Sequence, residues 1–157
     1  DHMVISEVEG QFLTYEGSII ATKDDFSDAK INFVIDVNSV DTDNEKRDGH
    51  LKSADFFETE KYPKMTFVST SVEKIADGKY NLKGKLTLRD VTKDITLAMT
   101  YGGTVKDTWG NTKAGLKVTG VINRTDFGLK YNSVLATGSL MIGEEVIITC
   151  KVELVKI

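Results

Sequence analysis

Histidine is the side chain whose charge changes most readily near neutral pH, and this chain of 157 residues contains two, His2 and His50. His50 lies in the segment RDGHLKSADFF, close to Arg47 and Asp48. One hypothesis is an enzyme acting on a hydrophobic substrate, in which His50 and Asp48 form the acid–base pair. The sequence has no GxSxG or HExxH motif to supply a nucleophile or a metal site beside them. We therefore favour a structural role, in which Arg47, Asp48 and His50 attach a helical insert to the rim of the fold.

The other reactive side chains form no catalytic or metal-binding pattern. A single cysteine, Cys150, excludes an intramolecular disulfide and a cysteine-based zinc cluster. It alternates in step with the apolar residues of VIITCKVELVKI, which predicts a small buried side chain and not a nucleophile. Carboxylate pairs such as Asp24–Asp25 and Glu144–Glu145 fall in turns or at strand starts, where they solvate the surface. We expect no catalytic residue, no metal site and no cofactor.

Hydrophobic alternation predicts the elements that carry these residues. The stretch YNLKGKLTL, from Tyr80 to Leu88, puts its tyrosine and leucines on one face of an extended chain and polar residues on the other. A change of phase between Phe12 and Tyr15 indicates a bulge in the first strand. The polar region around residues 43–57 is the one credible helical insert. The same period of two predicts seven strands, near residues 12–19, 31–37, 65–74, 80–88, 95–101, 114–122 and 146–157.

Length and charge restrict the class of protein further. We expect one all-β domain over residues 1–157, an antiparallel barrel or sandwich, since regularly spaced amphipathic strands dominate the chain. The net charge of −4 gives no electrostatic reason to expect nucleic acid or an anionic membrane as partner. No apolar run approaches the roughly 18 residues of a membrane-spanning helix.

The inner side of such a barrel has two interpretations. An eight-stranded barrel is just wide enough either to be filled by side chains or to hold one small ligand. The small residues Gly84, Ala114 and Gly120 lie on the apolar parity, where they would thin the lining and leave space. A solid core would use the same pattern, so periodicity alone leaves a structural barrel and a ligand-binding barrel equally open.

Four blocks in order then resemble a known family: HMVISEVEGQF, RDGHLKSADFFETEKYPKMTF, GKLTLRDVTKDITL and INRTDFGL. They resemble the YceI-like family of lipocalin-like, polyisoprenoid-binding proteins over essentially the whole chain. The resemblance implies an extended antiparallel eight-stranded barrel with a hydrophobic pore for an isoprenoid lipid, and no established reaction. It also implies a bacterial protein that is periplasmic or secreted. The family's motif positions fall on Arg47, Asp48, His50, Leu51, Phe56, Phe57, Tyr62, Pro63, Arg124, Asp126, Phe127 and Gly128.

One departure from the family concerns the first strand, which normally precedes the HM block and is missing from this chain. Seven strands would leave a bare sheet edge, which is a liability in water. Two arrangements would cover that edge. We favour a preceding strand in the full-length protein; the alternative is a neighbouring chain, as in a homodimer.

These observations predict a protein that binds, and carries or stores, a polyprenyl chain or an isoprenoid quinone in an apolar tunnel. Phe56 and Phe57 of the insert would close one mouth of that tunnel. The alternatives are the enzyme with His50 and Asp48 and a structural barrel with a solid core. The predicted ligand-binding residues are Phe12, Phe33, Ile35, Phe56, Phe57, Phe67, Leu82, Leu86, Leu88, Leu97, Met99, Leu116, Val118 and Phe127.

Overall fold

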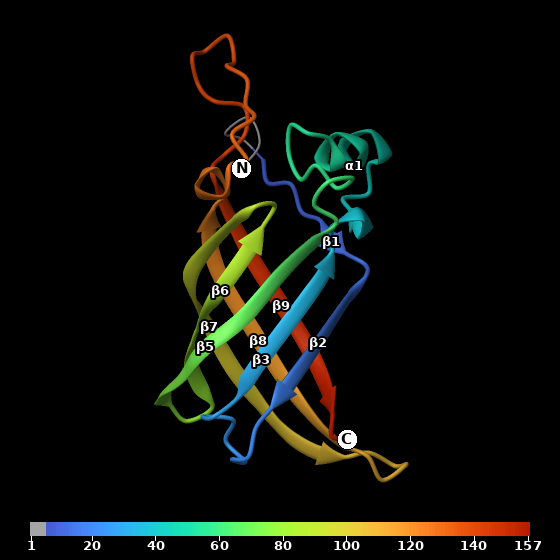
Figure 1. Cartoon of the computed structure of the whole chain (residues 1–157), viewed down its shortest axis with the longest axis vertical. Helices are drawn as coiled ribbons and strands as arrows, with labels where there is room; N and C mark the ends of the chain where they lie inside the picture. The colour runs from blue at the N-terminus through green and yellow to red at the C-terminus, as the bar shows by residue number, and fades with distance from the viewer. Residues whose placement is uncertain (1–5) are drawn as a thin grey trace.

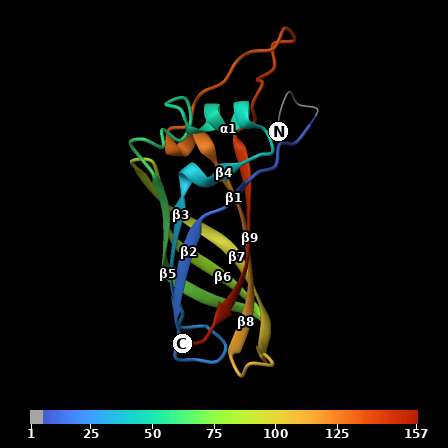
Figure 2. The same cartoon turned by 90° about the vertical axis from the view of Figure 1, so that its right-hand side faces the viewer.

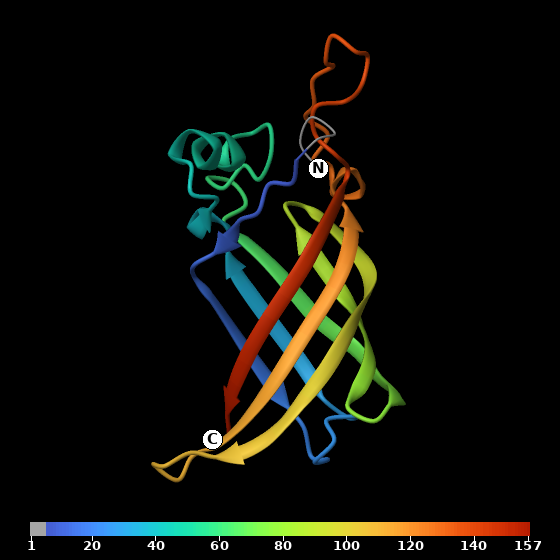
Figure 3. The same cartoon turned by 180° about the vertical axis from the view of Figure 1, so that it is seen from behind.

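The structure, a computed structural model, describes residues 6–157. Its main feature is one long, strongly curled antiparallel sheet (Figures 1 and 3). Its seven strands are hydrogen-bonded in the order β2-β3-β5-β6-β7-β8-β9, so each pairs with the next long strand of the chain. The predicted all-β antiparallel fold class is confirmed, and the seven strands form a half-barrel. The strands are β2 (Tyr15–Ile20), β3 (Lys30–Asp36), β5 (Lys64–Ala76), β6 (Lys79–Leu88), β7 (Val91–Lys106), β8 (Thr112–Asn123) and β9 (Glu145–Val155).

Alternation along β6 explains how the sheet acquires a dry face and a wet face. Leu82 and Leu86 are buried, while Lys83 and Lys85 on the other parity form ion pairs with Glu73 of β5 and Asp94 of β7. The register carries this parity from strand to strand, so apolar residues stay on the inner face of the curl. Bulges in β5 and β7 interrupt the register of these long strands, and bulges increase local twist and bending.

The first strand is broken, and the predicted bulge between Phe12 and Tyr15 is wrong. Phe12 belongs to a separate strand, β1 (Gln11–Phe12), which pairs with β4 (Val40–Asp41) in a two-stranded sheet. The backbone amide of Leu13 donates to the carbonyl of Ser39, so the chain bends there before β2 starts. The change of phase therefore reflects a move from one sheet to another.

The helical insert stands at one end of the curled sheet and contains the single α-helix of the described residues, α1 (Glu45–Lys52). Asn44 caps α1, because its side chain accepts a hydrogen bond from the backbone amide of Arg47 at 3.0 Å. Arg47 and Asp48 both bind Thr42 at the end of β4, which confirms the predicted attachment of the insert to the rim. Farther along the insert, Arg89 binds Glu58 at 2.7 Å.

The opposite end is covered by the β2–β3 connection, residues 21–29. The hydroxyl of Tyr80 donates to the backbone carbonyl of Asp25, and the ring of Phe26 lies 5.2 Å from that of Tyr101. Within residues 6–157 no helix has the length and apolar character needed to cross a membrane.

Candidate functional site

The fourteen residues predicted to bind a ligand all belong to one hydrophobic cluster. The register brings them together as cross-strand pairs, including Phe67 with Leu86 and Leu82 with Leu97. Phe127 enters the cluster from a 3-10 turn, η2 (Arg124–Phe127), that follows β8. The sequence therefore predicts which side chains share the inner face, while their role as ligand contacts stays a prediction.

The inner face is unevenly covered. At its centre, on β6 and β7, the side chains are packed against one another, and Met99 is only 1 % exposed. Toward the edge strands the inward residues become half-exposed: Phe33, Ile35 and Val118 are partly buried, and Tyr15 of β2 is 54 % exposed. The accessible part of the inner face is therefore a margin formed by β2, β9 and parts of β3 and β8, where Ile31, Ala114 and Leu116 stay buried.

Figure 2 shows this margin from the side on which the edge strands β2 and β9 lie, with β6 and β7 behind them. The inward positions of β9 are half-exposed or exposed and uncharged, and sequence analysis did not include them among the ligand contacts. The alternation of apolar residues around Cys150 in the sequence could have identified these positions. They are Val146, Ile148, Cys150, Val152 and Leu154.

Two glycines expected to leave space in the lining are covered by neighbouring side chains instead. A Cβ built on Gly84 would lie 2.4 Å from the ring of Phe67, and one built on Gly120 would lie 2.3 Å from Leu97. The prediction that these glycines open the inner face is thus wrong. Large residues on adjacent strands lie over the missing side chains, as aromatic rings commonly do over glycines in sheets.

Cys150 lies on the half-exposed margin, beside Val118 across the β8–β9 ladder. Burial raises the pKa of its thiol, because the charged thiolate loses hydration there. The raised pKa favours the neutral thiol. The predicted small buried side chain is thus half-buried and not fully buried.

The hypothesis of an acid–base pair formed by His50 and Asp48 is not supported by the geometry. Asp48 directs its carboxylate at the backbone amide of Thr42, 3.0 Å away, while His50 Nε2 lies 2.8 Å from Asp55 Oδ2. The ring of His50 also packs edge-on against Phe56 and Tyr131, with centroids 5.1 and 4.9 Å apart. His50 thus links the insert to the connection between β8 and β9.

The predicted closure of one end is partly visible in the aromatic contacts. The ring of Phe57 meets Phe12 edge-on at 5.9 Å, and Phe56 is buried in the cluster. Both phenylalanines follow α1, so the insert contributes apolar side chains to that end of the inner face. Among residues 6–157, no group of three or more histidine, cysteine, aspartate or glutamate side chains could hold a metal ion.

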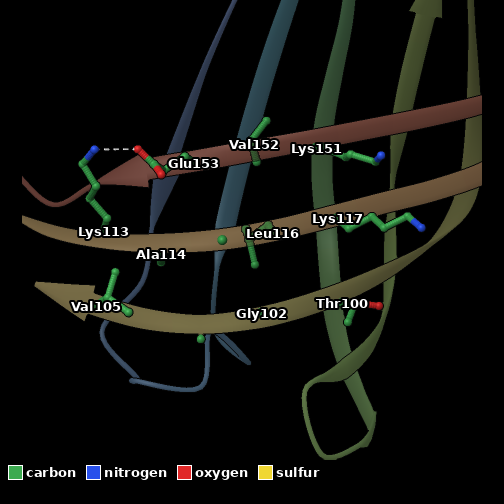
Figure 4. Close-up of a pocket in the computed structure, with 12 residues that line it drawn as sticks. Thr100, Gly102, Val105, Lys113, Ala114, Leu116, Lys117, Lys151, Val152 and Glu153 are labelled. Atoms are coloured by element: carbon green, nitrogen blue, oxygen red, sulfur yellow. Dashed lines mark hydrogen bonds and ion pairs between the residues drawn. The ribbon is translucent and has the colours of Figure 1, made fainter. Parts of the chain in front are cut away.

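Two hollows are lined by residues of both faces of the sheet. One, of about 580 Å³, lies across β7, β8 and β9 beside Gly102, Leu116 and Val152 (Figure 4). Lys113 binds Glu153 at its edge, while Lys117 and Lys151 are cross-strand neighbours on the outward parity. The other hollow, of about 430 Å³, lies beside the bulge of β5. The first hollow carries charged side chains at its rim, which distinguishes it from the uncharged inward positions of β9.

Comparisons with known proteins agree with this fold. Residues 1–154 match the YceI-like domain. A UPF0312 protein of Staphylococcus aureus is 36 % identical over 146 residues, covering 92 % of this chain and 82 % of that protein. The crystal structure of the Campylobacter jejuni YceI protein is 35 % identical, with a TM-score of 0.84 over 99 % of this chain and 89 % of the other.

A more distant structure shares the fold alone: a polyisoprenoid binding domain from Saccharophagus degradans, 17 % identical, with a TM-score of 0.71 over 98 % of this chain and 88 % of that chain. The curled antiparallel sheet and its uncharged inner margin define a lipocalin-like half-barrel. The chain belongs to the YceI-like family, as the four sequence blocks predicted.

Proposed function

We propose that this protein binds a long isoprenoid lipid, a polyprenyl chain or an isoprenoid quinone, along the inner margin of its sheet and carries or stores it. The observation that carries the proposal is the uncharged inner margin of β2, β3, β8 and β9, where most inward residues other than Ile31, Ala114 and Leu116 are half-exposed or exposed. The Saccharophagus degradans domain with the same fold is described as polyisoprenoid binding, which supports the ligand class.

The chemistry of the margin suits a hydrocarbon chain better than a polar substrate. Its inward residues contribute methyl, methylene and ring surfaces, and removing such surface from water stabilises a complex by about 25 cal/mol per Å². This driving force has no direction, so it favours a long apolar chain over a ligand that needs oriented polar contacts. Polar groups that would orient a small reactive substrate are missing from the inward positions of β9.

A ring introduced at Cys150 tests this proposal. Cys150→Phe should lower the lipid recovered with the purified protein about ten-fold, since the ring would occupy space that the bound chain fills and steric overlap costs about 1–3 kcal/mol. Thr149→Phe is the matched control, because Thr149 precedes Cys150 and lies on the opposite, exposed face. Organic extraction followed by mass spectrometry measures the lipid, and it also identifies the head group. Equal lipid in both variants, with both folded, would exclude binding on the inner margin.

A further inference from the structure

The connection between β8 and β9 contains a segment without charge. No charged residue occurs between Lys130 and Glu144, although 28 % of the whole chain is charged. At that average, 13 residues would carry about three or four charges, as expected for a solvated surface loop. The segment Tyr131–Gly143 reads YNSVLATGSLMIG and is rich in valine, leucine, isoleucine and methionine. Its composition is unusual for a loop surrounded by water.

This segment forms a hairpin that projects beyond the end of the sheet, on the same end as α1 (Figures 1 and 3). The backbone amide of Leu135 donates to the carbonyl of Ser139 at 2.8 Å, and the amide of Met141 donates to Ser133 at 2.9 Å. Val134 and Leu140 pair across the hairpin, and they are 68 % and 49 % exposed. Two neighbouring aliphatic side chains are therefore presented to the outside on an ordered backbone.

The base of the hairpin is fixed to the barrel by a buried arginine. Arg124 donates from Nε to the carbonyl of Gly143 at 2.8 Å and from Nη1 to the carbonyls of Leu129 and Tyr131 at 2.6 and 2.9 Å. Asn132 adds two hydrogen bonds to the backbone of Ile142. A buried guanidinium that holds backbone carbonyls on both strands gives the hairpin a rigid base.

We propose that the hairpin Tyr131–Gly143 inserts its apolar tip into the interface of a lipid bilayer. A bilayer fits the tip, because it accepts aliphatic side chains without needing a complementary charge or a shaped pocket. The net charge of −4 argues that apolar contact, and not attraction to anionic lipid, supplies the affinity. The contact goes beyond the proposed lipid binding, and it would bring the insert end of the inner margin to the source of its ligand.

The hairpin at the other end of the sheet provides an internal comparison. The β7–β8 turn exposes Trp109, 83 % of which is accessible, but Asp107 accepts hydrogen bonds from Trp109 and Asn111 and lies 3.8 Å from Lys113. Charged residues flank this turn, as is usual for a solvated hairpin. Of these two hairpins, the uncharged one has the composition expected of a membrane contact. The proposal therefore predicts that the end of the sheet with α1 faces the membrane and that the β7–β8 turn points away from it.

Vesicle flotation tests the contact directly. The wild-type protein should float with phosphatidylcholine vesicles, equally at about 0.15 M and 1 M salt because charges are not involved. Val134→Asp with Leu140→Asp should weaken flotation by about ten-fold or more, since the bilayer interior disfavours charge. Val105→Asp is the matched control, because Val105 is equally exposed on β7 near the far end. No flotation of the folded wild type, or flotation only with anionic vesicles at low salt, would overturn the proposal.

Fluorescence tests the orientation. In a Trp109→Phe background, Val134→Trp should shift its emission to the blue on addition of vesicles, while Trp109 of the wild type should keep its emission. A shift of Trp109 alone, or a concentration-dependent self-association that the double aspartate variant abolishes without any vesicle binding, would contradict membrane insertion of this hairpin.

The two proposals fail separately. The double aspartate variant should keep its copurified lipid, because both substitutions lie outside the inner margin. Wild-type protein that carries lipid but does not float disproves the membrane contact alone. Wild-type protein that floats but carries no lipid disproves the proposed function alone.

Discussion

Gly84 shows at the scale of one residue how the inner face is closed at its centre. Because a Cβ there would lie 2.4 Å from the Phe67 ring and 2.6 Å from the carbonyl oxygen of Val68, an alanine cannot be accommodated by a side-chain shift alone. We expect Gly84→Ala to lower the free energy of unfolding by about 1–3 kcal/mol, the usual cost of overpacking. Chemical denaturation measures this difference.

Gly49 is the matched control for that substitution. It lies in the middle of α1 and is exposed, and a Cβ added there would meet no neighbouring side chain within 4 Å. Gly49→Ala should therefore raise the free energy of unfolding by about 0.5–1 kcal/mol, because alanine restricts the unfolded chain and favours helix. If Gly49→Ala lowered the free energy of unfolding, or Gly84→Ala left it unchanged, local crowding would not explain the effect of these substitutions.

The choice of residue also decides how lipid binding can be tested. The sequence suggests Leu86→Arg, since Leu86 lies at the centre of the apolar face of β6. The structure shows Leu86 buried in the core cluster, so an arginine there would destabilise the fold whether or not a ligand binds. Cys150 is on the half-exposed margin, and a change there separates binding from folding.

At the scale of elements, the β2–β3 connection is organised by one carboxylate, and this gives a pH prediction. The hydroxyl and the backbone amide of Thr22, with the amide of Lys23, donate to Asp28 and lower the pKa of its carboxyl from 3.8 to about 2. Because the pKa is lowered in the folded state, the stabilisation is fully present above pH 3.8 and is lost as the pH falls toward 2.

Asp28→Ala should therefore lower the melting temperature by a constant amount at pH 5 to 8, and the difference from wild type should shrink between about pH 4 and pH 2. Thermal unfolding followed by circular dichroism measures both curves. Asp24→Ala is the control in the same connection, since its carboxylate accepts none of these hydrogen bonds. A difference that persists unchanged at pH 2 would show that the Asp28 carboxylate is not the source of the effect.

Sequence alone predicted the seven long strands because each has two chemically different faces, and period two is strong evidence for a strand. It missed β1 and β4, because two-residue strands are too short to show a period. Residues 123–145, which connect β8 to β9, have no regular hydrophobic period. The projecting hairpin within this connection depends on hydrogen bonds from Arg124 to backbone carbonyls up to 19 positions away in the sequence. Backbone carbonyls occur at every residue, so no sequence pattern identifies these partners.

At the scale of the whole molecule, the sequence could identify inward residues but not how exposed each one is. Alternation treats Met99 and Val118 alike, and they are cross-strand neighbours, yet Met99 is buried and Val118 is half-buried. The difference comes from position within the curled sheet. β7 and β8 are both paired on two sides, and Leu116 on the same face of β8 is buried, so exposure varies along a strand as well as toward the edge strands β2 and β9.

This gradient of burial makes a prediction about ligand removal. A lipid lying on the inner margin should protect the amides of β2 and β9 most, because local opening of these edge strands would require it to leave. Over the first minutes of hydrogen exchange, their rates should fall about 100-fold when free lipid reaches about 100 times its Kd. Amides of β6 and β7 are paired on both sides and should show no early change.

Comparing delipidated with reloaded protein by hydrogen exchange and mass spectrometry measures this map, and Cys150→Phe protein treated with the same lipid provides the control. Early protection on β5 and β6 with β2 and β9 unchanged would place the ligand away from the margin.

The same exchange map shows whether the ligand bridges the two edges of the sheet or lies along one of them. A ligand that bridges the inward side chains protects both edges together, since the two edge strands exchange no backbone hydrogen bonds with each other in the described sheet. Protection of one edge alone would mean that the ligand lies along a single strand and does not bridge the opening.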